Sequence, residues 1–226
     1  MARYAPDPAQ RVTVFLGEAG CGKSELAVQW ALTAAERRRD VHFFDLDQTK
    51  PLLRSRDAAA LLEGAGVTVH FEQQCADAPT QVGGLVPLLL DKSKSVILDV
   101  GGNDTGARLI GGYAHLLKSA DAYFVVNPYR PWSGTVEHID GTLSAVLKAR
   151  LGLPRFLLNP TLGIGTTAEE FLVGVEQGLR LLTPYVKVEA AAVSETLLPE
   201  VEGRTELPLL PLTPRMTVPE TGLDEG

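Results

Sequence analysis

Short apolar runs alternate with longer amphipathic stretches along most of the chain. Continuous apolar runs bounded by turn residues are typical of strands in a parallel sheet, and apolar residues at helical spacing predict helices. The predicted strands are residues 12–16, 41–46, 67–71, 95–100, 122–126, 155–158 and 186–192. The predicted helices are residues 24–39, 58–62, 80–90, 105–118, 135–150 and 168–182.

This alternation predicts an α/β fold with a doubly wound, mostly parallel sheet and helices on both faces. Ligands of such sheets bind beyond the carboxyl ends of the strands. Polar or glycine-rich clusters follow several of the predicted strands, namely GEAGCGKS, DLDQTK, DVGGND, VNPYRP and LNPTLG. We therefore expect these clusters to build one shared site.

The alternating pattern ends near residue 194. Residues 195–226 are rich in proline and lack helical periodicity, so we predict a domain over residues 1–194 and a proline-rich C-terminal tail. The tail is expected either to be disordered or to lie along the domain surface.

Composition narrows the class of protein. The chain has 226 residues, 45% of them hydrophobic and 22% charged, which is typical of a soluble globular protein. The formal net charge of -7 gives no strong nucleic-acid signal, and no apolar run reaches the length of a membrane span. The two cysteines form no zinc-type cluster, and residues 1–10 lack a secretory apolar region. We expect a cytoplasmic protein.

Residues 17–24, GEAGCGKS, match the P-loop pattern GxxxxGK[ST] and lie between a predicted strand and a predicted helix. The glycines allow backbone N–H groups to turn toward phosphate oxygens, and the helix start adds a positive dipole end. We expect Lys23 to bridge the β- and γ-phosphates and the Ser24 hydroxyl to bind Mg²⁺. The expected nucleotide contacts in this region are Gly17, Gly20, Cys21, Gly22, Lys23, Ser24 and Glu25.

Acidic residues end two further predicted strands. Asp99 is expected to hold Mg²⁺, and the DxxG pattern that it begins places the Gly102 N–H near the γ-phosphate. Asp47, preferred over Asp45, is expected to orient the attacking water or contact Mg²⁺, with a solvated acidic turn as the alternative. The predicted catalytic residues are Lys23, Asp47 and Asp99, and the predicted metal ligands are Ser24, Asp47 and Asp99.

With these motifs, residues 11–212 resemble the SIMIBI class of P-loop proteins, in its MinD/ParA/CobQ-like branch. The resemblance rests on the early P-loop, the acidic strand end with Asp45 and Asp47, the DVGG at residues 99–102, and the Asn-Pro pairs at Asn127 and Asn159. It implies ATP, Mg²⁺, slow hydrolysis and a possible homodimer. It also implies that Asn159 reads the base and that residues 207–212 pack on the adenine.

One residue departs from this family. Glu18 stands where MinD and ParA proteins carry a lysine that reaches across the dimer, and a carboxylate cannot stabilise a partner's phosphate. A cation that reaches the γ-phosphate would then come from Lys50, Arg54 or Arg56, either in the same chain or across a dimer. The alternative is that these three residues are surface charges. The guanine-reading pattern NKxD is absent, which favours ATP over GTP.

The resulting hypothesis is a Mg²⁺-dependent ATPase that acts as a nucleotide switch for an unidentified protein partner in assembly, maturation or positioning. A CobQ/dethiobiotin-synthetase-like ligase or small-molecule kinase is one alternative. A nucleotide-bound scaffold with little turnover is the other.

Overall fold

The computed structural model describes residues 3–5, 7, 9–37, 40–47, 58–71, 84–102, 104–148 and 152–215, apart from some side chains within these ranges. Its centre is a single sheet in which every strand pair is parallel, with the order β3-β2-β4-β1-β5-β6-β7-β8. The strands are β1 (Val12–Gly17), β2 (Val41–Leu46), β3 (Val67–Phe71), β4 (Ser95–Val100), β5 (Asp121–Val126), β6 (Arg155–Leu158), β7 (Val188–Ser194) and β8 (Leu209–Leu212).

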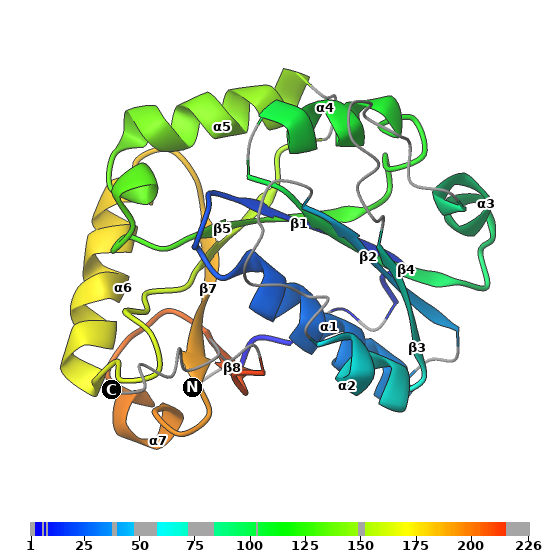
Figure 1. Ribbon diagram of the computed structural model, residues 1–226. Coiled ribbons are helices and arrows are strands. Elements are labelled where there is room, and N and C mark those ends of the chain that lie inside the picture. The colour runs from blue at the N-terminus through cyan, green and yellow to red at the C-terminus, as the bar shows by residue number, and fades with distance from the viewer. Residues whose placement is uncertain are drawn as a thin grey trace, which may run out of the picture.

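Helices cover both faces of this sheet (Figure 1). One face packs against α1 (Lys23–Arg37) and α2 (Ala59–Gly64). The other packs against α3 (Leu85–Leu90), α4 (Asp104–Gly112), α5 (Val136–Lys148), α6 (Ala168–Leu182) and α7 (Leu198–Val201). The predicted doubly wound α/β fold is therefore confirmed. Among the described helices, none is long and apolar enough to cross a membrane.

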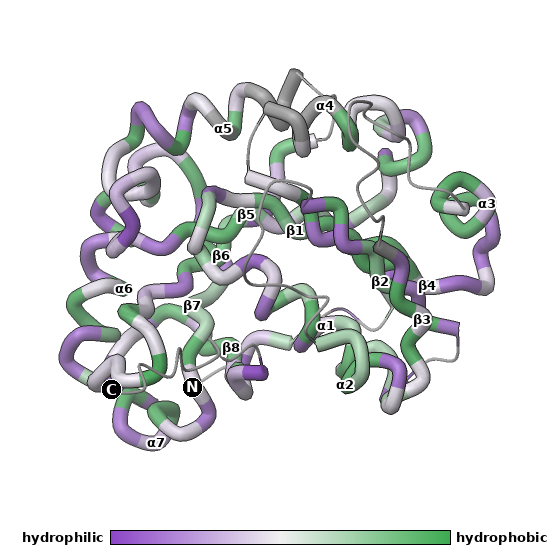
Figure 2. The backbone as a smooth tube through the Cα atoms, in the orientation of Figure 1, coloured by the Kyte–Doolittle hydropathy of each residue, from purple (hydrophilic) through white to green (hydrophobic). Residues whose placement is uncertain are grey.

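Alternating strand residues build two apolar cores, one on each face of the sheet, as the pleat of a strand requires. In β1, Val14 faces the α3–α7 side, while Phe15 faces α1 and packs edge-on against Trp30 with ring centroids 5.4 Å apart. Hydrophobic residues accordingly line the strands in Figure 2, while hydrophilic residues gather in the outer turns and helix faces. Both faces of the strands are buried, which explains their near-continuous apolar runs.

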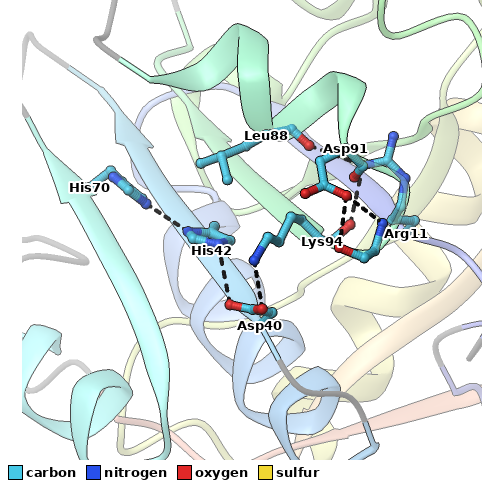
Figure 3. Close-up of polar contacts among 8 residues, drawn as sticks. Arg11, Asp40, His42, His70, Leu88, Asp91 and Lys94 are labelled. Atoms are coloured by element: carbon cyan, nitrogen blue, oxygen red, sulfur yellow. Dashed lines mark hydrogen bonds and ion pairs between the residues drawn. The ribbon is translucent and has the colours of Figure 1, made fainter.

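Polar contacts fix the amino-terminal edge of the sheet, at the opposite end of the strands from the P-loop (Figure 3). The Arg11 guanidinium donates to the carbonyls of Leu88, Leu89, Asp91 and Lys94, so it caps the end of α3. Lys94 in turn pairs with Asp40 at 2.6 Å. These contacts hold the starts of β1, β2 and β4 in register.

Several predicted boundaries differ from the structure. The predicted helix 105–118 ends earlier, as α4, because Gly111 and Gly112 weaken helical propensity. The predicted helix 80–90 is described only as α3, since residues 80–83 lie outside the described ranges.

The larger correction concerns residues 195–226. Leu209–Leu212 forms β8 and pairs with β7, so the sheet continues past the predicted domain end at residue 194. Pro211 made this segment look like part of a tail, but β8 is an edge strand, where proline is tolerated because one side of the strand needs no ladder partner. Residues 216–226 lie outside the described ranges.

Candidate nucleotide site

The loop of residues 17–24 leaves the carboxyl end of β1 at the centre of the sheet and enters α1. Gly17, Gly20 and Gly22 all have positive φ angles, of 140°, 73° and 90°. A Cβ atom at Gly17 would overlap the Val125 carbonyl, and one at Gly22 would overlap the Asn159 side chain. Glycine is therefore required for both the backbone conformation and the close packing of this loop.

Lys23, the first residue of α1, forms a buried ion pair with Asp47. Its Nζ lies 3.1 Å from Asp47 Oδ2, and the two side chains are 1% and 6% exposed. Asp47 follows β2 directly and its backbone N–H donates to the Asp45 carboxylate at 3.1 Å. The carboxyl end of β2 is thereby tied to the start of the P-loop helix.

Asp99 lies beside this pair, near the end of β4, and is 1% exposed. In the described part of the chain, neither of its carboxylate oxygens accepts a hydrogen bond. Burial, with a smaller contribution from the neighbouring Asp45, raises the pKa of Asp99 to about 6 against the lowering effect of Lys23. The Ser24 hydroxyl lies near enough to lower this pKa, although its geometry is not that of a hydrogen bond.

The charges of this cluster fit a divalent cation. Among the described residues, three buried carboxylates, Asp45, Asp47 and Asp99, lie near one buried ammonium group, that of Lys23. Buried charges are stable only when they are paired, so Asp99, with two unbonded oxygens, points to a positive ligand. Carboxylate and hydroxyl oxygens are what Mg²⁺ prefers, and Asp99, Asp47 and Ser24 can offer them.

Gly102, in the loop after β4, packs directly on the P-loop. A Cβ atom at this position would overlap the Gly17 carbonyl and lie 3.0 Å from Glu18 Cα. Gly101 is likewise packed against Asp47, whose Oδ1 would be 3.0 Å from an added Cβ. The DVGG segment is therefore in contact with both the P-loop and the end of β2.

Gly102→Ala is expected to reduce nucleotide affinity at least tenfold, because the added methyl group must displace the P-loop backbone. Isothermal titration with Mg²⁺ and ATP or GTP measures this change. Gly112→Ala is the matched control, since an added Cβ there meets nothing within 4 Å. Equal affinities for the two variants would mean that Gly102 does not constrain the loop.

Two asparagines follow the strands on the other side of β1, at the ends of β5 and β6. Asn159, which is 5% exposed at the end of β6, donates from Nδ2 to the Cys21 carbonyl at 2.8 Å. Asn127, at the end of β5, donates to the Thr161 carbonyl at 2.8 Å. Asn159 thus contacts the P-loop backbone itself, and its role in reading a base stays a prediction.

The segment after β8 reaches the same region. The Arg215 backbone N–H donates to the carboxylate of Glu25, in the first turn of α1. Residues 207–212 are largely buried, with Leu209 and Leu210 in the two cores, and their packing on a base stays a prediction. Leu210 and Leu212 thus share a core with α1, and Arg215 contacts the first turn of that helix.

Some predicted residues cannot be placed. Lys50, Arg54, Arg56 and Asn103 lie outside the described residues, as does the side chain of Asp104. One residue that the sequence analysis left unassigned does reach the loop, because Arg130 donates from Nε to the Gly20 carbonyl at 3.2 Å. Its position shortly after the Asn127-Pro128 strand end was the only signal in the sequence.

The fold and this loop together define an α/β protein with a P-loop motif at the carboxyl end of its central strand β1. No family model and no curated protein matches the chain. Several solved structures do align with it.

The nucleotide-binding protein from Archaeoglobus fulgidus in complex with ADP is 17% identical, with a TM-score of 0.47 and 84% of each chain covered. FlhF with GMPPNP and Mg²⁺ is 16% identical, with a TM-score of 0.41, and covers 69% of this chain and 57% of its own. FtsY from Elizabethkingia anophelis with GDP is 11% identical, with a TM-score of 0.44, and the alignment covers 95% of this chain and 61% of FtsY. The chain thus spans less than two thirds of FlhF and FtsY, and likenesses of this size say nothing about its function.

Proposed function

We propose that this protein binds a nucleoside triphosphate with Mg²⁺ at residues 17–24 and hydrolyses it slowly, as a switch read by a protein partner. Asp99 carries the proposal, because it is a fully buried carboxylate with two unbonded oxygens beside the P-loop lysine. A structural aspartate in a core would be hydrogen-bonded, whereas a Mg²⁺ ligand must keep an oxygen for the ion.

In this proposal, the residues of the site bind either the phosphates or the metal ion, according to where they lie. The P-loop N–H groups and Lys23 bind the phosphates, while Ser24, Asp47 and Asp99 hold the ion. Mg²⁺, when bound, neutralises charge on the phosphate oxygens. Asp47 can orient a water toward the γ-phosphate because it follows β2 directly and lies within 3.1 Å of Lys23.

ATP is the nucleotide we favour, on the absence of the NKxD pattern from the sequence. The switch role is supported by the contacts of the loop after β4. Gly102 packs on the P-loop and Gly101 on Asp47, so a ligand that moves either contact also moves the DVGG segment.

Phosphate release from ATP and from GTP, with Mg²⁺, tests the proposal. We expect slow release with the wild-type protein and a loss of at least tenfold in Lys23→Ala, since Lys23 contacts the phosphates. Lys187→Ala is the matched control, because Lys187 is exposed and, in the described part of the chain, pairs with Glu189 on the surface.

The other outcomes identify the alternatives. Release that appears only with an added metabolite would favour a ligase or a small-molecule kinase. Tight nucleotide binding without release would favour a scaffold. Release that is equal in Lys23→Ala and wild type would contradict hydrolysis at this site.

A further inference from the structure

Arg130 lies against the outside of the P-loop and has no role in the site described above. Its Nε donates to the Gly20 carbonyl at 3.2 Å, and its side-chain stem would be 3.8 Å from a Cβ atom at Gly20. The residue is half-buried, and among the described residues its guanidinium has no ion-pair partner. The terminal nitrogens of the guanidinium are therefore available to a ligand.

The backbone around Arg130 is held in place from several directions. Its N–H donates to the Asn127 carbonyl at 3.0 Å, and its own carbonyl accepts from the Ser133 N–H at 2.9 Å. Asn127 is fully buried and is fixed in turn by its bond to the Thr161 carbonyl. Arg130 is thus presented by a preformed turn, which lowers the entropy lost when it binds a ligand.

The strand order shows which end of a nucleotide Arg130 would meet. The carboxylates that suit Mg²⁺ follow β2 and β4, on one side of β1. Mg²⁺ binds the terminal phosphates, so the nucleoside must extend toward the opposite side, over β5 and β6. Arg130 and Asn159 follow those two strands and bind the adjacent carbonyls of Gly20 and Cys21.

We propose that Arg130 forms one wall of a nucleoside subsite, with its guanidinium packed against the base. A guanidinium is planar and weakly hydrated, so it stacks on flat aromatic rings, and its remaining N–H groups can donate to ribose oxygens. The Nε bond to the Gly20 carbonyl restricts the orientation of the guanidinium. This inference rests on the proposed function, because it needs the phosphates to occupy residues 17–24.

Titration calorimetry with two ligands, ADP and tripolyphosphate, each with Mg²⁺, separates the nucleoside contact from the phosphate contacts. We expect Arg130→Ala to weaken ADP binding about tenfold and to leave tripolyphosphate binding within about twofold. Arg130→Lys is expected to weaken ADP binding as well, because an ammonium group keeps the charge but not the plane. Arg180→Ala, at an exposed pair with Glu176, is the control.

Equal weakening of both ligands would overturn the inference, because Arg130 would then act on the phosphates or on the shape of the loop. Unchanged ADP binding in Arg130→Ala would overturn it too. Lys23→Ala tests the proposed function separately. If this variant no longer binds ADP or tripolyphosphate, the phosphates of both ligands bind at residues 17–24. A wild-type protein that binds neither ligand would contradict the proposed function, and this inference with it. Thermal melts confirm that each variant is folded.

Discussion

Asp47→Asn is expected to destabilise the nucleotide-free protein by about 2–3 kcal/mol, because it leaves the buried Lys23 ammonium without its closest counter-ion. Breaking a buried pair typically costs about 3–5 kcal/mol, and Asp99 and Asp45 lie close enough to reduce that cost here. Removing the Asp47 charge also relieves its repulsion with Asp99, which favours the variant. This gain is smaller than the loss of the ion pair, since Asp47 raises the pKa of Asp99 less than burial and Asp45 do.

Thermal unfolding of the nucleotide-free variant measures this effect. For a chain of this size, the expected loss corresponds to a fall in Tm of about 5–10 °C. Asp140→Asn is the matched control, because Asp140 is exposed on α5, and it should change Tm by less than about 2 °C. An unchanged Tm in Asp47→Asn would show that the Lys23–Asp47 pair contributes little to folding.

Asp99→Asn, at the carboxylate next to Asp47, is expected to have the opposite effect and to stabilise the nucleotide-free protein by about 1–2 kcal/mol. The pKa of Asp99 is raised to about 6, roughly two units above an unpaired carboxyl, so the buried charge costs up to about 3 kcal/mol. The asparagine amide is also a buried polar group, so part of the desolvation cost remains in the variant. The same variant should lose Mg²⁺-dependent nucleotide binding.

The pH dependence follows from the direction of this shift. Because the pKa of Asp99 is raised in the folded state, its charge destabilises the fold by the full amount above about pH 6, where Asp99 is charged in both the folded and the unfolded state. The cost falls as the pH falls from about 6 to about 4, since the folded state takes up the proton first. The advantage of Asp99→Asn over wild type, measured by urea unfolding, should therefore shrink over that range. An advantage that stays constant with pH would contradict a buried, charged Asp99.

Much of the fold could be predicted because its signals are local in the sequence. The buried strands carry continuous apolar runs, and the P-loop combines a fixed pattern with a preceding strand and a following helix. The parallel arrangement then brings Asp47, Asp99 and Lys23 to one edge of the sheet, as expected from the strand ends.

The remaining features depend on contacts between distant residues. β8 was missed because Pro211 is a strong breaker locally, and only pairing with β7 explains its strand conformation. The contact of Arg130 could not be predicted, because its position after Asn127-Pro128 does not reveal that its side chain reaches Gly20, 110 positions away. The contrast between a paired Asp47 and an unbonded Asp99 likewise appears only when the side chains are placed.

The central claim is that residues 17–24 bind a nucleotide together with Mg²⁺, and direct binding tests it without requiring turnover. The measurement is a calorimetric titration of wild type and Lys23→Ala with ATP and with GTP, each with Mg²⁺ and with EDTA. We predict binding of at least one nucleotide that needs both Mg²⁺ and Lys23. Binding that is equal in Lys23→Ala, or no binding of either nucleotide by the wild-type protein, would contradict the account.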